Sequence, residues 1–188
     1  MDQLTLALPE RARALLLALV EEMALGMLRC DATRSVAGAF PDDRALVDYC
    51  DVVIGSPLRF CMELFLGGRR DATRRTLEAR VHIAEASAFL QLANISRDLE
   101  KDFARGVVHV PELEPFLLHR KAHGLTEAVR AARARLSRLA LGFTPGFDAA
   151  VAAVAPGTFS PAALAARVMR RTTLRHHQRM LRRALSPR

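Results

Sequence analysis

A short segment between residues 91 and 106 carries the side chains best suited to chemistry. Gln91, Asn94, Asp98 and Asp102 follow one another at steps of three, four and four residues. A helix turns by about 100° per residue, so these four side chains share one stripe of a helix. Two carboxylates one turn apart, with Cβ atoms about 5–6 Å from each other, can hold a divalent cation. The segment therefore predicts a helix that lines a polar cavity and binds a metal ion.

Two arginines flank these carboxylates. Arg97 and Arg105 can reach phosphate oxygens or pair with the acids themselves. Mg²⁺ prefers hard oxygen ligands and is typically held by one or two carboxylates plus substrate phosphates. Gly106 is expected to end the helix, and the extended loop at 107–111 could close over a ligand. A pair of aspartates four residues apart is also common on solvated helices, so the prediction rests on the whole combination.

The segment resembles the second aspartate-rich motif of the squalene/phytoene synthases, which are all-α enzymes that join two prenyl diphosphates head to head. Two further segments resemble parts of the same family: Tyr49-Cys50 with Gly55-Ser56, and Glu22-Met23. The resemblance covers residues 16–111 well and the remainder only as generic helices. The pattern that carries it is Gln91-Leu-x-Asn94-Ile-x-Arg97-Asp98-x-x-x-Asp102-x-x-Arg105-Gly106, followed by Pro111.

The resemblance implies roles for particular residues. It implies that Asp98 and Asp102 are the catalytic metal ligands. The implied substrate-binding residues are Gln91, Asn94, Arg97, Arg105, Tyr49, Gly55 and Ser56. A prenyl channel could be lined by Leu58, Phe60, Met62, Leu64 and Phe65, although core packing is the favoured interpretation for most of them.

The family also implies a reaction and its cofactors. The expected cofactor is Mg²⁺, with Mn²⁺ as an alternative, and NADPH would be used if the product is of the squalene type. The expected substrate is farnesyl diphosphate for a squalene-type product or geranylgeranyl diphosphate for a phytoene-type product. Such products are precursors of carotenoids, hopanoids or sterols.

The sequence departs from the family pattern in an informative way. No D-x-x-x-D occurs before Asp98, so the family's first aspartate-rich motif is absent. In the closing loop, Val107 and His109 stand where Arg and Tyr are usual. We therefore expect a partial chain that does not run the full condensation efficiently by itself, with a second chain as one source of the missing motif. The alternative is a non-catalytic helical binding or assembly protein of the same family.

The rest of the sequence predicts one all-α domain over residues 1–188, a helical bundle of the isoprenoid synthase type that lacks the N-terminal helices. Asp42 or Asp43 caps a helix running through Tyr49 and Cys50, and Gly55-Ser56-Pro57 interrupts or kinks it. A loop at 30–41 and turns at 144–146 and 156–157 separate other elements. The expected helices are 4–28, 58–66, 73–104, 126–141, 147–155 and 161–185, with a further segment starting at 114 or 115.

Composition limits the partners. The net charge is +8, which favours anionic partners, but no motif for nucleic-acid binding accompanies it. We expect no nucleic acid and a cytoplasmic location. The arginine-rich last helix is interpreted as packed on the bundle with a solvated basic face, and a peripheral contact with the membrane is the alternative. No apolar run approaches the roughly 20 residues that span a bilayer. The cysteines Cys30, Cys50 and Cys61 are expected to be reduced and buried.

Overall fold

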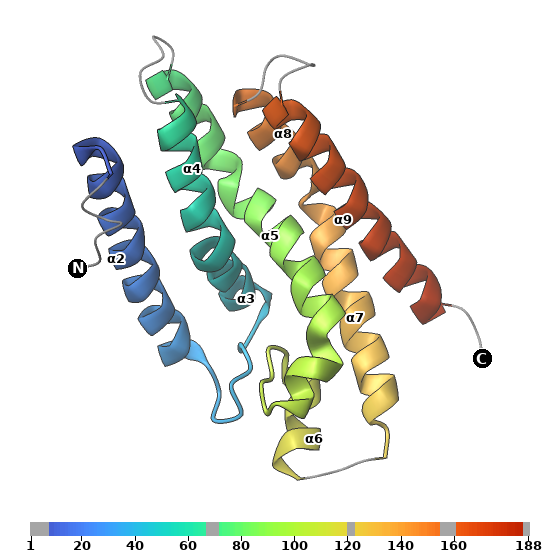
Figure 1. Cartoon of the computed structure of the whole chain (residues 1–188). Helices are drawn as coiled ribbons and strands as arrows, with labels where there is room; N and C mark the ends of the chain where they lie inside the picture. The colour runs from blue at the N-terminus through green and yellow to red at the C-terminus, as the bar shows by residue number, and fades with distance from the viewer. Residues whose placement is uncertain (1–7, 67–71, 120–122, 155–160, 186–188) are drawn as a thin grey trace.

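The computed structural model describes residues 8–66, 72–119, 123–154 and 161–185 (Figure 1). These residues form helices joined by short connections, and no strand occurs within them. The predicted all-α fold class is therefore confirmed, whereas the single domain over 1–188 stays a prediction. None of the described helices is both long and apolar enough to cross a lipid bilayer.

The helices follow one another with few residues between them. In chain order they are α2 (Glu10–Thr33), α3 (Asp43–Cys50), the π-helix η1 (Asp51–Gly55), α4 (Ser56–Leu66), α5 (Ala72–Ala104), the 3₁₀ turn η2 (Pro111–Leu113), α6 (Glu114–Leu118), α7 (Leu125–Gly142), α8 (Thr144–Val154) and α9 (Pro161–Leu185).

The long helix α5 is the centre of the bundle. It packs against α3, η1 and α4 on one side and against α7, α8 and α9 on the other (Figure 1). Its apolar residues Leu92, Ile95 and Leu99 are buried in the main core. Burying a side chain of this size stabilises the fold by about 1.5–3 kcal/mol. The same packing holds the polar stripe of α5 in a fixed orientation.

The segment from α3 to α4 follows one helical path with a wide turn in the middle. The Asp42 side chain accepts a hydrogen bond from the Ala45 amide at 2.8 Å and caps α3, as predicted. The predicted interruption takes the form of the π-helix η1, which ends at Gly55. A π-turn accommodates Pro57 without breaking the chain direction, because it shifts the hydrogen-bonding pattern just before the residue that lacks an N–H.

Three sequence predictions were wrong in detail. The helix α2 continues through Cys30 to Thr33, where the Thr33 hydroxyl bonds to the Cys30 carbonyl at 2.8 Å. The turn predicted at 144–146 is the first turn of α8, because Pro145 is well suited to the start of a helix. Cys61 is exposed, unlike Cys30 and Cys50, because the π-helix rotates the residues after it relative to those before it.

Candidate functional site

The predicted polar stripe lies along the C-terminal half of α5. Each of its members is half-buried: Gln91, Asn94, Asp98 and Asp102. The Asn94 amide donates a hydrogen bond to Gln91 Oε1 at 3.1 Å, so the two amides hold each other in place. The stripe therefore joins a neutral hydrogen-bonding half to an acidic half near the end of the helix.

A groove of about 490 Å³ lies beside the neutral half of the stripe. It is large enough for a small molecule, since ligand pockets typically measure about 300–1,000 Å³. We call it the α4–α9 groove, because residues of η1, α4, α5 and α9 line it. Its apolar lining consists of Ile54, Pro57, Leu58, Cys61, Leu90, Ala93 and Met169.

Polar side chains reach this groove from two helices. Asn94 and Arg97 come from α5, and Thr172, Thr173 and His176 come from α9. Of the residues expected to line a channel, Leu58 lines this groove, whereas Phe60 lines a separate cavity of about 190 Å³. The Phe65 side chain is outside the described residues. The α4–α9 groove is thus mainly apolar and meets the motif at Asn94 and Arg97.

Asp98 is paired with the residue beside it. Arg97 donates two hydrogen bonds to its carboxylate, from Nη2 at 2.8 Å and from Nε at 3.2 Å. The hydrogen bond from Arg97 keeps the pKa of Asp98 below its usual value, and the positive charges of Arg97, Lys101 and Arg105 act in the same direction. Asp98 is therefore ionised at neutral pH, as a metal ligand must be. Arg105 is exposed, and its side chain makes no hydrogen bond or ion pair with another described residue.

Asp102 faces a histidine that follows the end of α5. Gly106, at φ +78°, lets the chain turn back, and His109 Nε2 then lies 3.6 Å from Asp102 Oδ2. Burial lowers the pKa of His109, which is 8% exposed, so its ring is neutral at pH 7. The His109 ring stacks at 5.9 Å on Tyr49. The structure thus brings Tyr49 and Asp102, which are far apart in the sequence, to the same histidine.

Arg34 adds a cation to this group. Its guanidinium lies 4.3 Å from the centre of the Phe40 ring and 5.2 Å from that of Tyr49, within cation–π range. Its Nη1 donates to the Gly38 carbonyl at 3.1 Å. Burial raises the pKa of Tyr49, so the phenol stays protonated. Arg34, Phe40, Tyr49, His109 and Asp102 therefore form one cluster, which we call the Tyr49 cluster.

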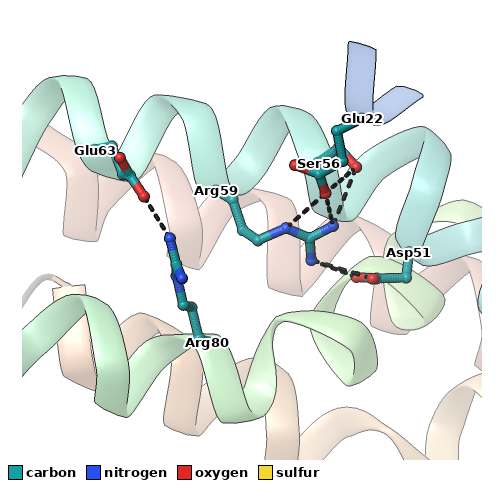
Figure 2. Close-up of polar contacts among 6 residues, drawn as sticks. All are labelled: Glu22, Asp51, Ser56, Arg59, Glu63 and Arg80. Carbon is teal, nitrogen blue, oxygen red and sulfur yellow. Dashed lines mark hydrogen bonds and ion pairs between the residues drawn. The ribbon is translucent and has the colours of Figure 1, made fainter. Parts of the chain in front are cut away.

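Gly55 and Ser56 lie in a different environment (Figure 2). Arg59 donates to Asp51 at 2.9 Å and to Glu22 at 2.7 Å. The Ser56 hydroxyl donates to Glu22 at 2.8 Å and accepts from Arg59 Nη2 at 3.0 Å. A Cβ atom at Gly55 would overlap the Asp51 carboxylate. We call this the Arg59 network; it joins α2, η1 and α4, and neither Gly55 nor Ser56 lines the α4–α9 groove.

The donor chemistry of the stripe suits a hard cation only in part. Asp98 and Asp102 offer carboxylate oxygens, which Mg²⁺ and Mn²⁺ prefer, and waters and diphosphate oxygens would have to complete about six ligands. Within the described ranges, no group of three or more His, Cys, Asp and Glu side chains gathers into a metal site. The residues therefore fit a cation that arrives with its own anionic ligand.

Sequence reasoning missed several residues of these sites. Arg34 and Phe40 flank a loop and belong to no motif, and only the fold brings them to Tyr49. Arg59 follows Asp51 by eight residues, a spacing of about 12 Å along an ordinary α-helix that does not suggest an ion pair. The α9 residues Thr172, Thr173 and His176 gave no signal, because they lie about 80 residues from the motif.

Comparison with known proteins agrees with the motif. The squalene/phytoene synthase family model matches residues 3–186. The match extends through α7, α8 and α9, where the sequence motifs indicated only generic helices. No curated protein and no solved structure matches the chain. The chain therefore belongs to the squalene/phytoene synthase family, whose function is of the prenyl-transferase type in isoprenoid biosynthesis.

Proposed function

We propose that this protein condenses two prenyl diphosphates head to head in a Mg²⁺-dependent reaction. The observation that supports this most directly is the junction of the α4–α9 groove with the α5 stripe at Asn94 and Arg97. A prenyl diphosphate has the same division, with a long apolar chain attached to a compact polyanion. The prenyl chain of the substrate would lie along Leu58, Leu90 and Met169, and its diphosphate would point toward Asp98.

Arginines would receive the diphosphate. Arg97 holds Asp98 in the structure, and its fork geometry suits a phosphate as well as a carboxylate. An incoming diphosphate with its cation would let Arg97 exchange Asp98 for phosphate oxygens. The exposed Arg105 can approach the same anion without giving up a partner among the described residues. Both arginines would then neutralise the charge that develops on the leaving diphosphate.

Asp98 and Asp102 would hold the cation, which when bound supplies Lewis-acid assistance to the departure of diphosphate. Tyr49 would act beside them. Because burial keeps its phenol protonated, it can donate a hydrogen bond to a diphosphate oxygen. The apolar groove would exclude water from the allylic cation, which the double bond of the second prenyl chain attacks. This attack, with loss of a proton, would give a cyclopropyl intermediate that still carries the second diphosphate. For a squalene-type product the second diphosphate would leave as well, and the hydride that ends the reaction would come from NADPH.

Substrate binding and product formation test this proposal separately. Binding of a farnesyl thiodiphosphate analogue is measured by calorimetry with Mg²⁺, with Mn²⁺ and with a chelator. We expect binding that needs the cation and is lost in Asp98→Asn/Asp102→Asn. Incubation with farnesyl or geranylgeranyl diphosphate, with and without NADPH, should then yield a head-to-head hydrocarbon. Cation-independent binding, or binding unaffected by the double variant, would contradict the proposed site.

A second function is favoured by one observation. Within the described residues, Asp98 and Asp102 belong to no group of three or more His, Cys, Asp and Glu side chains that could hold a metal ion. Departure of a diphosphate assisted by several cations needs more ligands than two carboxylates supply. A protein that binds prenyl diphosphate without condensing it fits that donor set. Tight cation-dependent binding without any hydrocarbon product would favour this binding function over catalysis.

A further inference from the structure

The last helix, α9, has two very different sides. It contains seven arginines and two histidines and no acidic residue. Its inner side is engaged with the bundle: His177 is fully buried, Arg170 pairs with Asp148 of α8, and Met169 and His176 line the α4–α9 groove.

The outer side combines apolar and basic residues in sequence. Leu164 and Val168 are 59% and 55% exposed near the start of the helix. Arg171, Arg175 and Arg179 follow at steps of four residues, so they continue the same face. All three arginines are exposed, and none of their side chains makes a hydrogen bond or ion pair with another described residue. We call these five residues the outer face of α9.

Such a face is unfavourable in water by itself. Like charges four residues apart on a helix repel each other, and α9 offers no carboxylate to relieve the repulsion. Ordinary solvated surfaces mix the two signs of charge. An anionic partner would remove the repulsion, and a partner with an apolar layer would also cover Leu164 and Val168.

The chemistry of the face distinguishes between two anionic partners. Nucleic acid would engage the arginines but would leave the leucine and valine in water, and α9 has no Phe, Tyr or Trp to stack on bases. An anionic bilayer offers both phosphate groups and an acyl boundary about 5–10 Å below the surface. The observations therefore favour lipid.

We propose that the outer face of α9 docks this protein on an anionic lipid bilayer. Arg171, Arg175 and Arg179 would contact the headgroups, while Leu164 and Val168 would enter the interface. The α4–α9 groove is lined by the neighbouring side of the same helix, through Met169, Thr172 and His176. Docking would thus hold the groove close to the membrane surface. The proposal does not depend on catalysis, because it concerns residues outside the stripe.

Vesicle co-sedimentation of the full chain tests the proposal. Vesicles of phosphatidylcholine are compared with vesicles containing 30 mol% phosphatidylglycerol. We expect binding to the anionic vesicles only, weakened by 0.5 M salt. Each arginine near an anionic surface contributes about fivefold to partitioning, so Arg171→Gln/Arg175→Gln/Arg179→Gln should weaken binding about 100-fold. Leu164→Ser/Val168→Ser should weaken it about tenfold and leave the residual binding more sensitive to salt.

A matched variant separates docking from net charge. Arg29→Gln/Arg44→Gln/Arg138→Gln removes the same three charges from exposed positions on other helices, and it should keep nearly full vesicle binding. Thermal melting of each variant checks that the fold is intact. Equal losses in the two triple variants, or no binding to anionic vesicles, would overturn the proposal. Binding to duplex DNA that is lost only in the α9 variant, without vesicle binding, would assign the face to nucleic acid instead.

Discussion

Two pairs of carboxylates in this protein have opposite environments. In the Arg59 network, Glu22 and Asp51 come from different elements and share one guanidinium (Figure 2). In the α5 stripe, Asp98 pairs with its own neighbour Arg97, and Asp102 has a neutral histidine at 3.6 Å. The first arrangement connects α2 to η1 and α4. In the second, the ion pair of Asp98 lies within α5, and Asp102 contacts the loop that follows the same helix.

This difference separates structural acids from acids available to a ligand. Removing Arg59 would leave the half-buried Asp51 without its ion pair and Glu22 with the Ser56 hydroxyl alone, and it would break the contact that joins α2 to η1 and α4. Removing Arg97 would leave the half-buried Asp98 without a salt bridge, and because Arg97 itself is exposed, such a pair contributes about 0–1 kcal/mol. A ligand can therefore compete for Asp98 at little cost to the fold. The comparison predicts which substitutions change binding and which change stability.

The largest expected effect is on ligand binding. Asp98→Asn/Asp102→Asn should weaken cation-dependent binding of a prenyl diphosphate analogue by about 100-fold or more, because both proposed ligands lose their charge. The unfolding free energy should change by less than about 0.5 kcal/mol. The matched variant Glu22→Gln/Asp51→Asn should do the reverse and lower stability with binding retained. The comparison fails if both double variants lose stability equally, as measured by urea unfolding.

Acid should destabilise the fold through the buried His177, which belongs to neither pair of carboxylates. Burial lowers the pKa of His177 to about 4, below its usual value of about 6.5. The folded state disfavours the protonated ring, so this contribution is complete above pH 6.5 and is lost as the pH falls toward 4. We expect a loss of about 2–3 kcal/mol over that window.

Urea unfolding at several pH values measures this loss. His177→Gln should be less stable at pH 7 and show a flatter pH profile, whereas the exposed His119→Gln should keep the profile of the parent protein. Glu22 has a lowered pKa with Arg59 as a partner, so its contribution is present above about pH 4.5 and lost only below it. An unchanged profile in His177→Gln would assign the acid sensitivity to other groups, among them His109 and His176, whose pKa values burial also lowers.

A smaller effect is expected at the π-helix. Gly55→Ala places a Cβ atom against the Asp51 carboxylate, which must leave Arg59, at a cost of about 1–2 kcal/mol. In an Asp51→Ala background the same change should stabilise by about 0.5–1 kcal/mol, because alanine is the better helix residue. Gly142→Ala, where an added Cβ meets no atom within 4 Å, is the control. Equal costs in both backgrounds would show that Asp51 is not the obstacle.

The smallest effect is expected at Arg97. Arg97→Gln should leave stability within about 0.5 kcal/mol of the parent. Because Asp98 is released, binding of Mn²⁺ alone should tighten a few-fold, while binding of the diphosphate analogue should weaken as a phosphate partner is lost. Calorimetry with each ligand measures both. Changes of the same sign for the two ligands would contradict the exchange of partners proposed for Arg97.

The sequence predicted the elements well where the pattern was long and periodic. The helix expected at 73–104 is α5, and the one expected at 126–141 is α7, because burial of one face repeats with the helical period. The sequence did not predict the start of α8 or the end of α2 correctly, because side-chain hydrogen bonds and packing decide these two boundaries. The exposure of Cys61 was not predicted, because the π-helix changes the number of residues per turn just before α4.

By itself, the sequence determined the family and the stripe of Gln91, Asn94, Asp98 and Asp102, because residue types at helical spacing need no tertiary information. Only the tertiary structure decided which carboxylates pair with an arginine from another helix, since Arg59 meets Glu22 through packing of α2 on α4. It also decided that Tyr49 and Asp102 meet at His109 and that α9 completes the groove. Contacts between residues distant in the sequence depend on how helices pack, which local patterns do not encode.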